Sequence, residues 1–293
     1  MRYRVFVPIT LVLCTGLFGA ATPARAQAWI EEPGSGYLQP SYRRISGDAF
    51  YDGDGEAQDL PSTYTQQTLS LYGQFGILPR WLQLTVSGEL YRHNELEDQG
   101  ATFGLGDLRV GLWTGLLQGA HNLSFGLWLG IPSGDDSPQG PEGDLEGQGI
   151  ARSLPTGDGE TDVTPTLAYG TAFGGGGWPL LHYVSASVGY QVRSQGLQSA
   201  LEYGLSFGTS APYPVVERIW LVFALNGRES LGGSSTSGSF AGLGDGVSYT
   251  GLAVGLDVSI WNGLGVTARL EIAVRATNVI SGGPLSVGLF WDF

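Results

Sequence analysis

The sequence contains no lysine, and its single cysteine, Cys14, lies close to the N-terminus. All 14 basic residues are therefore arginines, and 27 acidic residues outweigh them to give a formal net charge of −13. Proteins that bind nucleic acids neutralise phosphates with basic side chains, so we expect no nucleic-acid partner for this acidic chain. Beyond residue 26 no cysteine is left to form a disulfide, act as a thiolate nucleophile or bind a metal.

The chain also lacks long apolar runs beyond residue 26, although 42% of all its residues are hydrophobic. The longest such run is Ile219 to Leu225, whereas a membrane-spanning helix needs ~20 apolar residues. Glycine is abundant instead, with 48 residues, well above the ~7% of an average protein. Abundant glycine among aromatic residues and short alternating segments is typical of β-barrels.

The N-terminus has the three parts of a secretory signal peptide. Arg2 and Arg4 form the charged part, Val5 to Ala20 form the apolar part, and Ala24-Arg25-Ala26 provides a cleavage site. We therefore predict that residues 1–26 are removed and that residues 27–293 form one barrel domain. The alternative is a membrane anchor, but the apolar run is short for a membrane span.

Apolar residues recur at every second position through most of the remaining chain, which is the pattern of β-strands with one apolar face. Leu252, Val254, Leu256 and Val258, for example, alternate with small or polar residues. Twelve such segments can be recognised. They are residues 36–44, 65–76, 81–93, 104–117, 123–133, 161–173, 181–194, 199–209, 218–229, 248–260, 265–277 and 285–293.

The last segment, Leu285 to Phe293, ends the chain on a strand with one apolar face. In a soluble protein it would be an exposed, aggregation-prone edge. A closed barrel with lipid outside removes that problem, because every strand is then paired and the apolar face meets hydrocarbon. The terminal aromatic residue also resembles the C-terminal signature of bacterial outer-membrane barrels. That resemblance implies recognition of Phe293 by the barrel-assembly machinery.

The connections between these segments are short after even-numbered strands and mostly long and polar after odd-numbered ones. Outer-membrane barrels separate short periplasmic turns from long outer loops in this way, and an even strand count places both termini in the periplasm. Aromatic residues near the short turns predict an interface belt. They are Trp81, Trp178, Tyr213, Trp261 and Phe293.

These patterns predict an all-β fold: a transmembrane, antiparallel, up-and-down β-barrel of about 12 strands, exported to the bacterial outer membrane. A soluble β-sandwich is the alternative, since it would also show alternation. An arginine facing the middle of the bilayer costs roughly 2–4 kcal/mol, so in a barrel the apolar face must point outward.

The opposite parity then defines the lumen, where charged and aromatic residues are candidates for a solute path. They are Glu89, Arg109, Trp113, Trp128, Glu202, Asp257, Arg269, Glu271 and Arg275. Symmetry about the connecting turns predicts that Asp257 opposes Arg269 and that Glu89 opposes Arg109. Such pairs either neutralise charge inside the barrel or form a constriction that selects solutes.

Six aromatic residues are expected to face inward, where they could line a track for aromatic solutes or fill the interior. They are Tyr72, Tyr91, Trp113, Trp128, Tyr183 and Trp220.

The predicted outer loops are acidic, and the first contains the segment Asp52-Gly-Asp54-Gly-Glu56. These three acidic residues are the best calcium candidates in the chain, but the segment lacks the twelve-residue spacing and the terminal bidentate glutamate of a calcium loop. We therefore expect no metal site and no cofactor. Hydrated loops, or divalent cations bridging the loops to lipopolysaccharide, explain the acidity better.

The three histidines lie at strand ends or in a turn, and none forms a recognisable Ser–His–Asp arrangement, so we do not expect an enzyme. Two short motifs stand out instead: Gly104-Leu-Gly-Asp-Leu108, which opens a strand, and Leu154-Pro-Thr-Gly-Asp158, which ends the third long loop. With the signal peptide and the aromatic C-terminus, they resemble the meta-pathway phenol-degradation family of outer-membrane proteins. That resemblance implies a transporter-like barrel admitting small aromatic or hydrophobic compounds, without catalytic residues.

The expected function is passive passage of small molecules, with hydrophobic or aromatic ones as candidates, across the outer membrane. The expected partners are outer-membrane lipid, lipopolysaccharide and the solute itself. Two alternatives remain open from the sequence. One is a closed structural barrel whose acidic loops bind divalent cations, lipopolysaccharide or another partner, and the other is a barrel enzyme.

Overall fold

The computed structural model describes residues 27–136, 154–174, 180–232 and 242–293. The predicted signal peptide therefore lies outside the described residues. Fourteen strands form a single antiparallel sheet. They are β1 (Gly36–Tyr51), β2 (Ala57–Leu78), β3 (Leu82–Leu96), β4 (Gly100–Gly104), β5 (Leu108–Leu117), β6 (His121–Ile131), β7 (Asp162–Gly174), β8 (Leu181–Arg193), β9 (Ala200–Tyr213), β10 (Val216–Ser230), β11 (Ser248–Trp261), β12 (Leu264–Thr277), β13 (Val279–Ile280) and β14 (Leu285–Asp292).

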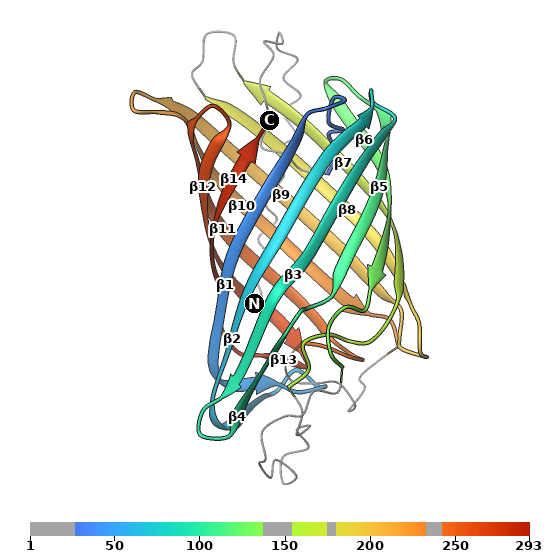
Figure 1. Ribbon diagram of the computed structural model, residues 1–293, viewed down its shortest axis with the longest axis vertical. Helices are drawn as coiled ribbons and strands as arrows, with labels where there is room; N and C mark the ends of the chain where they lie inside the picture. Colours follow the sequence, from blue (N-terminus) through green and yellow to red (C-terminus); the bar gives the residue numbers. More distant parts are fainter. Residues whose placement is uncertain (1–26, 137–153, 175–179, 233–241) are drawn as a thin grey trace, which may run out of the picture.

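The sheet closes on itself, because β1 pairs both with β2 and with β14. At this seam Tyr37 lies opposite Asp292 and Arg44 lies opposite Leu285. The short strands β4 and β13 extend β3 and β1 beyond the wall, so twelve strands form the barrel itself (Figure 1). The predicted twelve-stranded, up-and-down barrel is confirmed.

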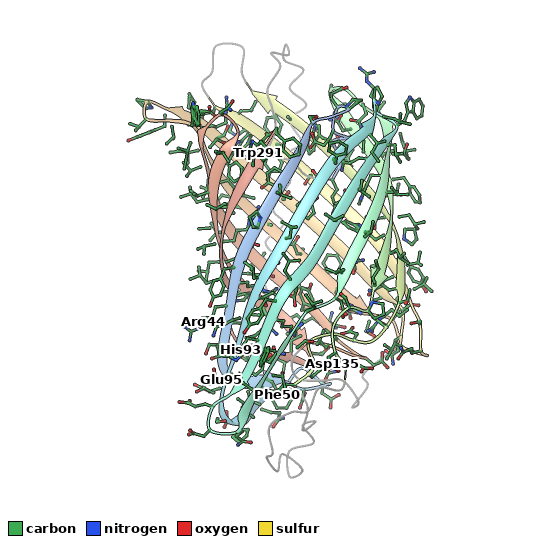
Figure 2. The ribbon with its side chains drawn as sticks, viewed as in Figure 1. Arg44, Phe50, His93, Glu95, Asp135 and Trp291 are labelled. Carbon is green, nitrogen blue, oxygen red and sulfur yellow. The ribbon has the colours of Figure 1, made fainter. Side chains whose placement is uncertain are left out.

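The barrel is apolar outside and polar inside, the reverse of a water-soluble domain. Val254 and Leu270, on neighbouring strands, are 42% and 49% exposed on the outer wall. Gln83, Thr85 and other polar side chains are fully buried inside. Side chains project from the wall along its whole height in Figure 2. This outer surface suits lipid, and the fold is that of bacterial outer-membrane proteins. No helix among the described residues is long and apolar enough to cross a bilayer.

The first strand begins and the last strand ends at the rim where the strands are joined by short turns. Trp81, Tyr213 and Trp261 are strongly exposed there, and Trp291 marks the same rim in Figure 2. This matches the predicted aromatic belt for the residues that can be seen, while Trp178 lies outside the described residues. We refer to this rim as periplasmic and to the opposite rim as extracellular.

Two connections predicted as long loops are instead strand extensions. β1 and β2 continue past the apolar band as a hairpin that turns at residues 52–56, where a loop over residues 45–64 was expected. Likewise, β3 runs on to Leu96 and pairs with β4. Beyond the membrane one face of these extensions meets water, while Phe50, Leu60 and Leu96 pack in a buried apolar cluster. The backbone ladder therefore persists without the regular apolar alternation on which the prediction relied.

Two β-bulges reverse the predicted side-chain direction beyond them. Leu69 pairs with Tyr91 but Ser70 pairs with Glu89, so one residue of β3 has no partner and Tyr91 turns outward. The prediction that Tyr91 faces the lumen is therefore wrong. A second bulge, between the pairs Thr250–Arg275 and Gly251–Ala273, acts in the same way on β12. A bulge inserts one residue into one strand and so inverts the alternation after it.

Candidate functional site: the plugged lumen

Residues 27–35 precede β1 and occupy the periplasmic half of the lumen; we call them the plug segment. Barrel side chains hold its backbone directly. The Ser124 hydroxyl donates to the carbonyl oxygen of Gln27 at 2.7 Å, and the backbone N–H of Glu31 donates to Oε1 of Gln83 at 2.8 Å. Both barrel side chains are fully buried, so the lumen wall supplies fitted hydrogen-bond partners for the segment.

Apolar contacts complete the fit. Ala28 packs in a buried cluster with Trp113, Trp128 and Ala168, and Trp29 packs against this cluster. Trp113 and Trp128 meet edge to face, with ring centroids 6.0 Å apart. Trp113, expected on a solute path, is 0% exposed and packs against the plug segment. Trp128 also borders open space in the lumen.

That open space is a cavity of about 900 Å³. The plug segment contacts strands from β2 to β8, while the cavity extends mainly along β8 to β14. Its lining reaches from Gly263 and Asp292 at the periplasmic rim to Arg109 and Glu202 higher in the barrel. The plug segment thus fills one side of the lumen and leaves space along the other.

An ion pair crosses the lumen at the upper end of this cavity. Arg109 of β5 reaches Glu202 of β9, with Nη1 3.2 Å from Oε1. Its Nη2 donates to Oγ1 of Thr164 at 3.0 Å and lies 3.7 Å from Oδ1 of Asp162. The guanidinium also lies 5.5 Å from the ring centroid of Trp128, a cation–π contact. Both charged side chains of the crossing pair are about 30% exposed, so they remain accessible to solutes.

The predicted pairing of Arg109 with Glu89 is wrong. Ser87, not Glu89, lies opposite Arg109, because β3 pairs with β4 and β5 symmetrically about residue 98 and not about residue 99. Glu89 instead pairs with Arg43 at 3.1 Å and with Arg92 at 3.4 Å. These three residues form a second charge cluster on the wall.

Asp257 and Arg269 are neighbours, but they lie diagonally. Asp257 is opposite Thr267, whose hydroxyl donates to Oδ1 at 2.5 Å, and Arg269 is opposite Gly255. A bulge between Ser259 and the periplasmic turn shifts the register from the predicted one. Nη2 of Arg269 therefore lies 3.8 Å from Oδ2 of Asp257, a longer contact than the crossing pair makes.

Of the remaining predicted solute-path residues, Glu271 shares the inward parity of Arg269, and its side chain lies over Gly251. Arg275 does not face the lumen. The bulge in β12 turns it to the outer wall, where it forms an ion pair with Glu229 at 3.0 Å. This correction removes Arg275 from the solute path.

The two motifs that carry the family resemblance contact each other at the extracellular rim. Oδ1 of Asp107 accepts the N–H of Gly134 at 3.0 Å, and Oδ2 accepts the N–H of Asp158 at 2.8 Å. Asn94 and Thr102 donate to the carbonyls of residues 155 and 154. The bond from Asp158 to Asp107 thus joins the two motifs directly, while Asn94 and Thr102 hold the second motif from β3 and β4.

A buried arginine anchors the same loop. Arg193 of β8 contacts Asp158 at 3.0 Å and Glu160 at 2.5 Å, and it donates to the carbonyl of Gly244 at 3.0 Å. Burial raises the pKa of Glu160 from 4.5 to about 7, and it also raises the pKa of Asp158. The loop ending in β7 is thereby tied to β8 and to the β10–β11 connection.

The calcium candidates serve the turn between β1 and β2. Oδ1 of Asp52 accepts the backbone N–H groups of Asp54 and Glu56, and Oδ2 accepts the side-chain amide of Gln58. The Gln58 bond, with the backbone bonds, lowers the pKa of Asp52. Over the described ranges, no group of three or more potential metal-ligating side chains comes together. The acidic residues 142, 144 and 146 lie outside those ranges.

Comparison with known proteins gives a structural match only. No protein-family model matches the chain, and no curated protein matches it. An outer membrane channel from Pseudomonas putida F1 superposes with a TM-score of 0.60 at 12% identity, covering 93% of this chain and 100% of that one. This chain has the fold of that channel.

Two autotransporter barrels are also similar to the chain. The β domain of BrkA from Bordetella gives a TM-score of 0.47 at 13% identity, covering 88% of this chain and 99% of that chain. The translocator domain of NalP from Neisseria meningitidis gives 0.40 at 12% identity, with 90% and 91% covered. At these scores neither match supports an argument about function.

Sequence reasoning missed the plug segment and Arg43, Asp162 and Arg218, which also face the lumen. One signal could have indicated the segment. Trp29 and Ile30 stand between the predicted cleavage site and the first strand, where no alternation assigns them to the wall. Large apolar residues in such a position need a burial site, and the barrel interior is the nearest one.

Proposed function

We propose that the protein is a passive outer-membrane channel for small molecules, with a preference for hydrophobic or aromatic ones. The observation that carries the proposal is the 900 Å³ cavity running beside the plug segment to the periplasmic rim. A barrel that served only as a structural anchor would not need such a space, since smaller barrels of about eight strands are filled by side chains alone.

The lining of the cavity supports the solute class. Tyr37, Tyr72, Trp128, Tyr183 and Trp220 border it, and they provide flat apolar surfaces. The charges in the lining are largely paired, through Arg109 with Glu202 and through Arg269 with Asp257. Aromatic walls with a few polar groups are typical of sites for small organic molecules. The fold shared with a bacterial outer membrane channel is consistent with this function.

Planar-bilayer recording and liposome swelling test the proposal on two proteins, the mature chain and a variant lacking residues 27–33. The deleted residues precede β1, and their one backbone bridge to the wall joins Pro33 to Gly76 of β2, so the variant keeps its strands. We expect low conductance for the mature chain and at least a several-fold increase for the variant. If neither protein conducts ions nor admits small phenols into liposomes, the channel proposal is wrong and a closed structural barrel becomes the better explanation.

Export through a cleaved signal peptide, recognition of Phe293 by the barrel-assembly machinery and contact with lipopolysaccharide belong to the same proposal. Phe293 is suited to recognition because its N–H and C=O groups pair with Gly36 at the seam and its ring is exposed on the outer wall. Deletion of Phe293 should slow membrane assembly in cells, and pulse-labelling of the heat-modifiable folded form measures that rate.

A further inference from the structure

The Trp29 side chain occupies a slot that the barrel wall forms by itself. Gly170 of β7 lies directly beneath the indole: a Cβ at this position would fall 2.4 Å from Cη2 and 2.6 Å from Cζ3 of Trp29. Such distances are too short for two non-bonded carbon atoms, so only a glycine at this position allows the ring to lie this close to β7. The residues before and after it on the same face, Ala168 and Ala172, are also small.

Aromatic side chains bound the slot on its other side. Tyr183 of β8 meets the Trp29 ring edge to face, with centroids 6.3 Å apart and planes at 88°. Trp220 of β10 in turn packs on Tyr183 at 5.5 Å and 60°. These two residues belong to a buried cluster with Leu181 and Val222, which Trp29 and Ala172 also contact. A slot with a flat floor of small residues and aromatic edges fits a planar ring.

The slot opens to the lumen cavity, because Ala168, Tyr183 and Trp220 line both. Its walls come from three barrel strands, whereas its occupant comes from a segment outside the strands. The slot therefore exists whether or not Trp29 fills it.

We propose that this slot is a binding site for planar aromatic molecules of indole size, and that Trp29 is an internal stand-in that competes with them. The inference rests on the proposed channel function and names both the solute class and its position. A solute that enters the slot displaces the indole of Trp29, and departure of the solute allows Trp29 to return. The slot thus couples solute binding to the position of the plug segment, because one site can hold only one ring.

Chemical rescue with indole tests the proposal. Trp29→Ala empties the slot without altering a strand, and the variant lacking residues 27–33 does so independently. By calorimetry in detergent, we expect indole to bind both variants at least about tenfold more tightly than the intact chain, the factor for a competitor that occupies the site about 90% of the time. In planar bilayers, we expect Trp29→Ala to conduct more than the intact chain, and added indole should lower this conductance in a saturable way. Cyclohexanol, which is not planar, should do neither.

Two further variants make the test specific. Gly170→Leu combined with Trp29→Ala fills the slot permanently and should abolish indole binding. Trp261→Ala removes a tryptophan from the outer wall at the periplasmic rim and should leave indole affinity at the level of the intact chain. Folding of each variant is checked by heat-modifiable migration in SDS gels.

The proposal is overturned if Trp29→Ala and the deletion variant bind indole no more tightly than the intact chain. It is equally overturned if the Gly170→Leu combination still binds as well as Trp29→Ala. Tight indole binding by Trp29→Ala in a protein that never conducts would refute the channel function but retain the site. Conduction by the deletion variant without indole binding would support the channel function but refute the site.

Discussion

Replacing Arg109 by glutamine should make the lumen more selective for cations. The Arg109–Glu202 pair crosses the lumen beside the cavity and is only about 70% buried on each side. The substitution leaves the carboxylates of Glu202 and Asp162 without their main positive neighbour. Fully hydrated ions passing this level would then meet one additional negative charge.

The size of the effect follows from Coulomb's law. A unit charge about 5 Å from an ion in water is worth about 0.8 kcal/mol, and screening at 0.15 M salt, with a Debye length of about 8 Å, reduces this to about 0.4 kcal/mol. Cations gain this energy and anions lose it, so the ratio of cation to anion permeability should rise about fourfold. The cost in stability should stay below about 1 kcal/mol because the pair is partly solvated.

Reversal potentials in a potassium chloride gradient measure the permeability ratio. The plug-deleted protein is the best background, since its larger current is easier to record. Glu202→Gln should shift the ratio in the opposite direction by a similar factor, and the double variant should return close to the starting value. Arg275→Gln is the matched control, because it removes the same charge from the outer wall and should not change selectivity. If both single variants in a conducting protein leave the reversal potential unchanged, the crossing pair does not lie on the ion path.

Three further outcomes follow from burial and close contact. Trp113→Phe should lower the free energy of unfolding in urea by about 1 kcal/mol and Trp113→Ala by about 3–5 kcal/mol, because the ring is fully buried while its N–H meets no acceptor among the described residues. Gly36→Val should lower the temperature at which the folded band converts in SDS gels, since a Cβ at this position would lie 2.8 Å from the Phe293 ring and 2.5 Å from a backbone oxygen of β2. The raised pKa of Glu160 means that this side chain stabilises the folded loop fully below about pH 4.5. That stabilisation is lost as the pH rises through about 7. Amide exchange of residues 154–162, corrected for intrinsic rates, should therefore be slower at pH 5 than at pH 8. Glu160→Gln should remove most of this difference, and equal exchange at both pH values would contradict the assignment.

The strands were predictable because the bilayer imposes one rule on every segment that crosses it. Val254 and Leu270 follow the same alternation on different strands, and that alternation was enough to predict the strand number, the outward face and the closed sheet. The apolar alternation is required only within the membrane. The hairpin of β1 and β2 beyond Ser46 and the pairing of β4 with β3 obey no apolar pattern, and they were taken for loops.

The candidate site was less predictable, because its contacts depend on register and on the width of the barrel. Single-residue bulges in β3 and β12 turned Tyr91 and Arg275 outward, and no residue type in the sequence marks a bulge. Arg109 and Glu202 are 93 positions apart, and only the closed barrel brings them within reach of each other. The plug segment has no periodicity at all, so its place in the lumen follows from tertiary packing alone.

The seam between β1 and β14 constrains the order of biogenesis. The first strand to emerge from the secretion machinery finds its second neighbour only when the final residues of the polypeptide arrive. Until then the growing sheet has two open edges that any other extended chain could join. The plug segment is joined directly to this first strand. It must therefore stay on the inner face of the curving sheet until the barrel closes.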